Sequence, residues 1–326
     1  MNTRTVIVGT GSCLPEKVLT NLDLEKMVDT SDAWITTRTG IRSRRIAVRG
    51  ETTSMLAANA ARQALAMAGM TPAELDMIVV GTITPDMTMP SCACLVQKEL
   101  RADKAFAFDL NAACSGFLFG LDLADKYLCQ NPVWKILVIG AETLSTRTNW
   151  QDRNTCVLFG DGAGAVVLTG AGGGRGMLGS RLFSDGRLWR LLSMEGAPSL
   201  NPDLARPEND GSYIRMEGRE VFKLAVRSMA DAVTRLLAEQ GVGVAEVGLV
   251  IPHQANLRIL HSLAERLGIP LEKVYINMDK YGNTSAASLP LAMDEANREG
   301  RLAVGDLLLL CAFGGGFTWG AALIRW

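Results

Sequence analysis

The stretch "AFAFDLNAACSGFLFGL", residues 105–121, joins a strand to a helix through a loop of small residues. The apolar run 105–110 is typical of a buried strand, and apolar residues then recur at helical spacing over 115–128. Between the two stands Cys114, with Ala, Ser and Gly around it that leave room for a substrate. The stretch alone does not distinguish a small core residue from a nucleophile, so the rest of the chain must decide.

The same alternation of strands and helices occurs twice along the sequence. The first copy comprises helix 52–70, strand 75–82, helix 91–100, strand 105–110, helix 115–128, strand 134–142 and a glycine-rich strand pair over 155–170. The second comprises helix 219–241, strand 247–252, helix 257–268, strand 273–278, helix 285–300, strand 306–313 and a glycine-rich final strand. Apolar strands separated by helices predict an α/β fold with parallel sheet covered on both faces.

The duplication predicts where a site would lie. Cys114 follows Gly81 by nearly the same separation as Asn283 follows Pro252, so we expect the two residues in matching loops. Ligands of open α/β sheets bind beyond the carboxyl ends of the strands, where His253 also stands. The expected organisation is a first half at 1–170, an insertion or lid at 171–216 and a second half at 217–326.

Composition narrows the class of protein. Of 326 residues, 48% are hydrophobic and 21% are charged, which suits a large buried core. The net charge of −1 provides no bulk attraction to nucleic acid or an anionic membrane. The seven cysteines are scattered without a zinc pattern, and no apolar run is long enough for a signal or membrane segment. We therefore expect a soluble cytoplasmic protein that binds no metal. The glycine motifs at 9–14 and 160–167 do not fit a dinucleotide site.

Few residues could carry chemistry. Of the two histidines, His261 belongs on a helix surface, whereas His253 ends a buried strand. Cys114 precedes a helix, where the helix dipole and a nearby imidazole would lower the pKa of a thiol. The Asn283 amide could donate to an oxyanion, or could simply shape a turn. The glycines at 314–316 could offer backbone N–H groups to an oxyanion, or form a hairpin. We interpret Cys311 as a packing residue.

Four ordered motifs carry a family resemblance. "NAACSGF" (111–117), "VIPHQANLRIL" (250–260), "YGNTSAASLPLA" (281–292) and "AFGGGFTWGAALIRW" (312–326) together resemble β-ketoacyl-acyl-carrier-protein synthase III, a condensing acyltransferase of the thiolase fold. The resemblance extends over almost the whole chain. It implies two duplicated halves packed as a layered αβαβα sandwich, a homodimer and the initiation of fatty acid synthesis. It implies no cofactor and no nucleic-acid or membrane partner.

The resemblance also implies roles for individual residues. Cys114 would take an acyl group from acyl-CoA, and His253 and Asn283 would bind the thioester carbonyl of malonyl-acyl carrier protein. The N–H groups of Cys114 and Gly315 would form the oxyanion hole. The remaining implied contacts are Trp34, Arg38, Arg153, Phe222, Ala255 and Asn256 for CoA; Gln254, Ala255, Asn256, Leu257 and Arg258 for the carrier protein; and Met89 and Phe313 for the acyl pocket.

Alternatives differ in what they predict. An initiation enzyme of a secondary-metabolite pathway shares these motifs and stays open, as does the choice of acyl primer. Elongating condensing enzymes use two histidines, and the only other one here, His261, belongs on a surface. A papain-like hydrolase has the same Cys, His, Asn order but predicts a C-G-S-C-W motif that is absent. A non-catalytic acyl-CoA-binding protein predicts no covalent intermediate.

Overall fold

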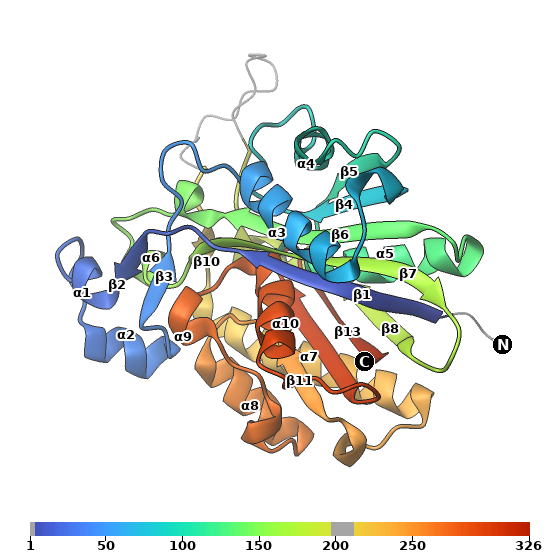
Figure 1. Ribbon diagram of the computed structural model, residues 1–326. Coiled ribbons are helices and arrows are strands. Elements are labelled where there is room, and N and C mark those ends of the chain that lie inside the picture. The colour runs from blue at the N-terminus through green and yellow to red at the C-terminus, as the bar shows by residue number, and fades with distance from the viewer. Residues whose placement is uncertain (1–3, 197–211) are drawn as a thin grey trace.

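The computed structural model describes residues 4–196 and 212–326, in which two large sheets alternate with three layers of helices (Figure 1). The first sheet has the strand order β1 (Arg4–Cys13), β7 (Asp161–Ala171), β6 (Lys135–Thr143), β4 (Met77–Gly81) and β5 (Phe106–Leu110). The second has the order β11 (Leu249–Pro252), β12 (Leu307–Gly314), β13 (Thr318–Arg325) and β8 (Gly176–Ser184).

Helices separate and cover the two sheets. The middle layer holds α5 (Gly116–Gln130) and α10 (Ser288–Arg298), whose apolar faces pack between the sheets. The outer face of the first sheet carries α3 (Thr53–Ala68) and α4 (Cys92–Leu100), and that of the second carries α7 (Gly218–Gln240) and α8 (Leu257–Leu267). The expected αβαβα sandwich is therefore confirmed.

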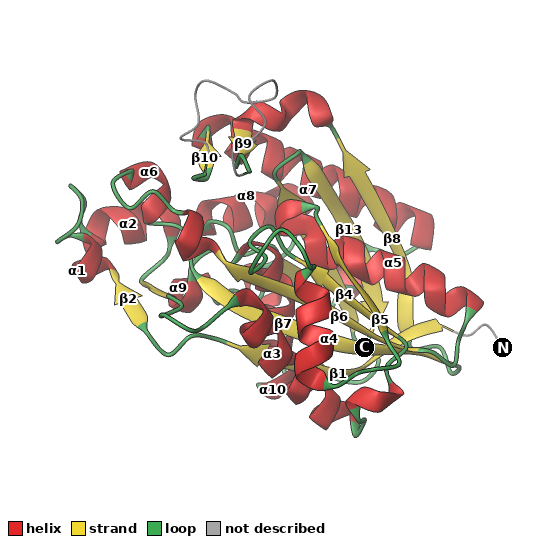
Figure 2. Ribbon diagram, turned by 90° about the horizontal axis from the view of Figure 1, so that it is seen from above, coloured by secondary structure: helices red, strands yellow, loops and turns green. Residues whose placement is uncertain are grey.

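Shorter elements complete the fold, and Figure 2 shows α1, α2 and α6 together at one end of the molecule. These shorter elements are β2 (Val18–Thr20), α1 (Asn21–Leu24), α2 (Asp32–Thr39), β3 (Ser43–Arg45), α6 (Arg153–Cys156), β9 (Leu192–Ser193), β10 (Arg215–Met216) and α9 (Met278–Tyr281). Within the described part of the chain, no helix has the length and apolar character needed to cross a membrane.

Strand β4 illustrates why the sheet strands read as apolar throughout. Met77 and Val79 pack into the middle layer, while Ile78 and Val80 pack against the outer helices. Successive side chains of a strand point to opposite faces, so a strand covered on both sides needs apolar residues at every position.

Some expected elements differ from those observed. Among the strands of the two large sheets, as far as the structure describes them, only β4 with its two neighbours and β11 with β12 pair in parallel, whereas β7 and β13 run antiparallel to their neighbours. The expected strand pair over 155–170 is wrong, since the short helix α6 precedes a single strand. The Asp152 carboxylate caps this helix by accepting from the N–H of Asn154.

The expected strand 273–278 is also wrong. Val274 forms only an isolated bridge with Val250, after which the chain turns into α9. The reason is local, because the N–H of Asn277, a donor that a longer strand could use, bonds the side-chain oxygen of Gln254 at 3.1 Å. A side chain thus takes over a backbone donor, and the pairing ends.

Of the segment 171–216, expected as an insertion or lid, residues 197–211 lie outside the described residues. The part before them supplies β8, which pairs with β13 at the edge of the second sheet. This segment is therefore partly integral to the second half.

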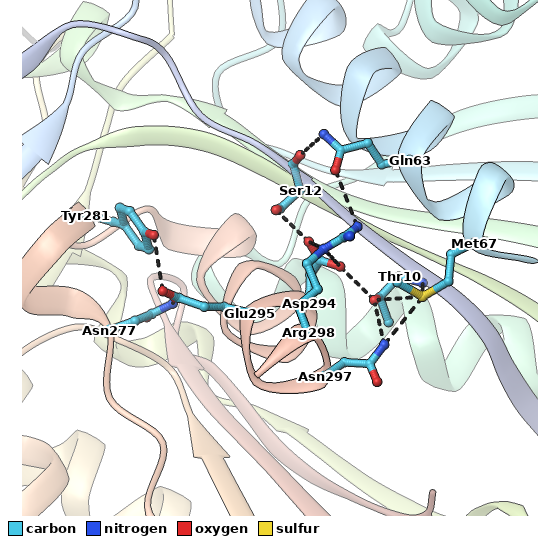
Figure 3. A network of polar contacts seen from close by, with 10 residues as sticks. All are labelled: Thr10, Ser12, Gln63, Met67, Asn277, Tyr281, Asp294, Glu295, Asn297 and Arg298. Carbon is cyan, nitrogen blue, oxygen red and sulfur yellow. Dashed lines mark hydrogen bonds and ion pairs between the residues drawn. The ribbon is translucent and has the colours of Figure 1, made fainter. Parts of the chain in front are cut away.

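Buried polar contacts join the two halves between β1 and α10 (Figure 3). The fully buried carboxylate of Asp294 accepts hydrogen bonds from Thr10 at 2.7 Å and Ser12 at 2.6 Å on β1, and pairs with Arg298 one helical turn away. A buried carboxylate is tolerated only when its oxygens are satisfied in this way. The network fixes α10, and with it the loop of Asn283, against the first half.

Candidate active site

A cavity of about 930 Å³ opens between the two halves, and Cys114, His253 and Asn283 all line it. Cys114 follows β5, His253 follows β11, and Asn283 lies in the loop before α10. The structure thus brings together three residues that are far apart in the sequence.

Cys114 sits in a tight turn of 3₁₀ helix, Ala113–Ser115, directly ahead of α5. Ala113 adopts the left-handed conformation, with φ of 47°, which turns the chain sharply at the end of β5. Gly314 at the end of β12 presses against this turn, because a Cβ there would lie 2.7 Å from the Cys114 nitrogen. Glycine is needed at 314 for the backbone to approach Cys114 so closely.

His253 is held at both ends. Its backbone N–H donates to the Cys311 carbonyl at 2.8 Å, and its ring Nδ1 lies 2.6 Å from the Ser288 hydroxyl. Burial lowers the pKa of the imidazole to about 4, because the charged form loses its hydration. His253 is therefore neutral near pH 7.

Asn283 presents donors to the cavity. Its side-chain oxygen accepts from the Ser285 N–H at 2.9 Å, and its backbone bonds Leu158 and Gly160. Among the residues that the structure describes, none accepts a hydrogen bond from its side-chain nitrogen. The amide can therefore donate to an oxygen atom in the cavity, as a residue that binds a carbonyl must.

The duplication matches residue by residue around these loops. Asn111 accepts from the Ala113 N–H at 3.3 Å as Asn283 accepts from that of Ser285, and Ser285 has a φ of 50°. The helices then begin at Gly116 and Ser288. The loops of Cys114 and Asn283 do match, but the counterpart of Asn283 is Asn111 rather than Cys114.

The thiol is less acidic than expected from the sequence. Burial raises the pKa of Cys114 to about 11, while the nearby Ser285 hydroxyl acts to lower it and the Glu142 carboxylate raises it further. His253 does not lower the pKa of Cys114, because the imidazole is neutral and provides no positive charge. The expectation of a lowered thiol pKa is therefore wrong.

Glu142 is a buried carboxyl whose charge acts on the Cys114 thiol. It accepts hydrogen bonds from Thr84 and Thr82 and from the N–H of Ile83, yet burial raises its pKa to about 7. The Ser285 hydroxyl meets no partner at full hydrogen-bond geometry among the described residues, but lies close enough to lower the pKa of both Glu142 and Cys114. A substitution of Glu142 should therefore change the pKa of the Cys114 thiol.

Replacing Glu142 by Gln is expected to lower the pKa of Cys114, because it removes the nearby negative charge and keeps an oxygen for the threonines. The pH dependence of alkylation by iodoacetamide measures this, with Cys114→Ala used to subtract the other cysteines. Alkylation of Cys114 should begin at lower pH in Glu142→Gln than in the wild type. A profile that is unchanged or moved to higher pH contradicts the prediction.

The same substitution should change stability with pH. Between its ordinary value of 4.5 and about 7, Glu142 keeps a proton in the folded state that it loses in the unfolded chain. Its contribution to the free energy of unfolding thus falls as pH rises through this window, by at most about 1.4 kcal/mol per pH unit. Urea unfolding at several pH values measures the free energy of unfolding of the wild type and of Glu142→Gln. The difference between the two should change with pH by that slope.

The residues expected to bind CoA lie at the mouth of the cavity. The Arg153 guanidinium lies 4.7 Å from the centre of the Trp34 ring, and that of Arg38 lies 6.0 Å from it. Trp34 and Arg38 line the cavity, whereas Arg153 lies beside it and also bonds the Asp29 carbonyl at 2.9 Å. This direct contact leaves no space for a purine, so a sandwich would require Arg153 to move.

A second group lies beside the first, since the Asn256 amide donates to the Arg38 carbonyl at 3.2 Å. Phe222, Ala255, Asn256 and Arg258 line the cavity, and the Arg258 guanidinium lies 5.7 Å from the centre of the Phe222 ring. Leu257 instead packs against Gly40 at the end of α2. Gly315 and Phe313 line the same cavity as Cys114.

Two expected contacts are wrong for a single chain. Gln254 is only 1% exposed, because its amide bonds the carbonyls of Pro252 and Tyr275, so its side chain is not available to a docking protein. Met89 is 85% exposed and does not line the cavity of its own chain. The sequence motif around each residue indicated that it lies near the site, but the motif did not show which way the side chain points.

Sequence reasoning missed several residues at the site. Arg219 and Lys223 line the cavity with Phe222 between them, and their one-turn spacing at the start of α7 was the available signal. Ser285, Ser288 and Glu142 had no signal, since their importance depends on contacts with distant elements. In residues 4–196 and 212–326, no cluster of three or more His, Cys, Asp or Glu side chains could hold a metal.

Comparison with known proteins places this arrangement among described enzymes. Family models of 3-oxoacyl-[acyl-carrier-protein] synthase III match residues 108–186 and, for the C-terminal part, 237–326. The β-ketoacyl-[acyl-carrier-protein] synthase III of Desulfotalea psychrophila is 59% identical over 98% of this chain and 99% of its own length. The crystal structure of 3-oxoacyl-[acyl-carrier-protein] synthase III from Aquifex aeolicus superposes with a TM-score of 0.93 at 53% identity, covering 99% and 100% of the two chains.

A priming β-ketosynthase from the R1128 polyketide biosynthetic pathway is also similar, with a TM-score of 0.91 and 35% identity over 99% of this chain and 96% of that one. The layered sandwich and its Cys, His and Asn cavity define the class of protein, a condensing acyltransferase of the thiolase fold. Within that class, the chain belongs to the β-ketoacyl-[acyl-carrier-protein] synthase III family.

Proposed function

We propose that this enzyme transfers an acyl group from acyl-CoA to Cys114 and condenses it with malonyl-acyl carrier protein, which begins a fatty acid chain. The observation that carries the proposal is the convergence of Cys114, His253 and Asn283 in one cavity between the halves. Relatives named for this activity at up to 59% identity support it.

In the first half-reaction, the Cys114 sulfur attacks the thioester carbonyl of acyl-CoA. The N–H groups of Cys114 and Gly315 would stabilise the oxyanion, as backbone donors do in acyl transfer. The C–S bond to CoA then breaks, and the proton lost by Cys114 ends on the departing CoA thiol. The small residues around Cys114 leave the approach to the sulfur open.

In the second half-reaction, the bond between the malonyl carboxylate and its α-carbon breaks and CO₂ leaves. The electron pair forms an enolate, whose oxygen would accept hydrogen bonds from His253 Nε2 and the Asn283 amide. The α-carbon then attacks the acyl-Cys114 carbonyl, the bond from this carbonyl to the Cys114 sulfur breaks, and the thiolate released takes up a proton from solvent. A neutral imidazole suits this role, because it donates a hydrogen bond without carrying a charge into a buried site.

The mouth of the cavity suits nucleotide and acidic partners. Trp34, Arg38 and Arg153 would bind the nucleotide of CoA, with Phe222, Ala255 and Asn256 along its pantetheine arm. Arg258, with Arg219 and Lys223 beside it, would meet the acidic surface of the carrier protein, and guanidinium groups suit both phosphate and carboxylate.

Trp34→Ala tests the nucleotide contact. Losing a stacking surface for adenine should raise the KM for acyl-CoA about tenfold, from the energy typical of one stacked base. The rate at saturating acyl-CoA should change little. Acyl-pantetheine, which lacks the nucleotide, serves as the control and should be used equally well by both enzymes. An equal loss with both substrates would instead indicate a disturbed cavity.

We also propose a homodimer. Strand β5 stands at the edge of its sheet, and its exposed Phe106 belongs to a cluster of aromatic side chains with Phe108, Tyr127 and Trp134. An apolar edge strand favours pairing with a second copy. Met89 lies just before α4, whose first N–H groups bond Asp109 of β5, so a partner at this edge would also cover Met89. A single-chain mass in solution would contradict this arrangement.

The alternative is initiation of a secondary-metabolite pathway with a different acyl primer, which the likeness to the R1128 priming enzyme favours. Reconstitution with a panel of acyl-CoA primers and malonyl-acyl carrier protein decides between them. Activity with acetyl-CoA supports the fatty acid role, and activity only with other primers supports the alternative. Absence of any 3-ketoacyl product would remove both.

A further inference from the structure

The hydroxyl of Ser288 is committed to the catalytic imidazole. Ser288 is 2% exposed at the first position of α10, and its Oγ lies 2.6 Å from His253 Nδ1. It does not cap the helix, since Ala287 holds the cap position and no side chain makes a cap hydrogen bond. Within the described residues, His253 is the hydrogen-bond partner of the Ser288 hydroxyl.

The duplicated half shows that the fold does not require a serine here. The equivalent helix, α5, begins at Gly116, which packs closely against Gly81 of β4, where a Cβ would meet the Gly81 Cα at 3.2 Å. A helix can thus begin at this point of the framework with no hydroxyl. The half that carries the histidine is the half that carries the serine.

The direction of this hydrogen bond decides what the imidazole can do. A neutral imidazole carries one proton, on Nδ1 or on Nε2. If Nδ1 donated to Ser288, Nε2 would face the cavity with a lone pair and would repel a carbonyl oxygen. If Ser288 donates to Nδ1, the ring proton stays on Nε2, beside the donors of Asn283.

We propose that Ser288 is a positioning residue that donates its hydroxyl proton to His253 Nδ1 and so keeps the ring proton on Nε2. That the substrate carbonyl accepts a hydrogen bond from Nε2 rests on the proposed function. The tautomer of His253, by contrast, is a property of the free enzyme and can be measured without substrate. Ser288 thus acts on the substrate only through His253.

Nitrogen NMR of ¹⁵N-histidine-labelled enzyme tests the tautomer directly. The chain has two histidines, so His261→Gln assigns the signals of His253. Wild type should show the Nε2–H tautomer near pH 7, and Ser288→Ala should show a mixture of the two tautomers. Ser288→Cys, which keeps a weak donor, should lie between them. Ser180→Ala removes another buried serine hydroxyl, bonded to Asp122 away from the cavity, and should retain the wild-type tautomer.

Kinetics provide a second readout. Ser288→Ala should slow condensation about ten- to a hundredfold, the loss seen when the partner that orients a metal-bound histidine is removed. Acylation of Cys114 by acyl-CoA, which does not need the Nε2 proton, should change little. Ser180→Ala should slow neither step.

An Nδ1–H tautomer in the wild type would overturn the proposal, as would a Ser288→Ala enzyme with the wild-type tautomer and condensation rate. A wild type that shows Nε2–H but no condensation would refute the proposed function and leave the role of Ser288 in place. Equal losses of both half-reactions in Ser288→Ala, with the tautomer unchanged, would show a structural role only and so count against the proposal.

Discussion

Cys114→Ala is expected to abolish both acyl-enzyme formation and condensation. Without the sulfur no thioester can form on the protein, and loss of a covalent nucleophile typically costs a factor of about 10⁴ or more in turnover. The decisive measurement is intact-protein mass spectrometry after incubation with acyl-CoA, which should show one added acyl group on the wild type and none on the variant.

Cys311→Ala provides the matched control for this experiment. Cys311 is also fully buried near the site, but burial raises the pKa of its thiol to about 12 and it does not line the cavity. We expect Cys311→Ala to be acylated like the wild type. If Cys114→Ala were still acylated, or if Cys311→Ala alone failed to be acylated, the nucleophile would have to be a residue other than Cys114.

His253→Ala is expected to separate the two half-reactions. Removing a donor to the enolate should slow condensation by about 10²- to 10³-fold, the cost of losing one oxyanion donor, and acylation of Cys114 should be retained in large part. Asn283→Ala should have the same effect, because we propose that its amide binds the same enolate oxygen as His253. The two losses should not add fully in the double variant, as is usual for residues that act together.

Separate assays of acyl-enzyme formation and of malonyl decarboxylation measure this division. His261→Ala changes the exposed histidine of α8 and should leave both steps at the wild-type rate. A His253→Ala enzyme that decarboxylates malonyl-acyl carrier protein normally but cannot be acylated would reverse the assignment.

Much of the fold follows from periodicity in the sequence. The run 105–110 and the helix after it are recognisable because the strand is covered on both faces and the helix on one, and each burial pattern leaves its own spacing of apolar residues. The direction of β7 and β13 was not predictable in this way, since fully buried parallel and antiparallel strands show the same apolar pattern. The end of pairing near Val274 depends on the side chain of Gln254, a contact that local sequence does not show.

The site divides in the same manner. Cys114 follows β5, His253 follows β11 and Asn283 lies in the loop that matches that of Cys114, so the duplicated order was enough to bring the three residues together. Ser288 and Glu142 act through contacts between elements distant in the chain, and only the packing of α10 and β6 reveals them. The thiol pKa was misjudged because the helix and the imidazole were considered without the cost of burial.

The most direct test is to locate the acyl group in the wild-type enzyme. After brief incubation with a labelled acyl-CoA and acid quenching, peptide mapping should find the label on the peptide that contains Cys114, and adding malonyl-acyl carrier protein before the quench should discharge it as a 3-ketoacyl product. Label on any of the other six cysteines, or a Cys114 thioester that malonyl-acyl carrier protein fails to discharge, would contradict a shared site for Cys114, His253 and Asn283.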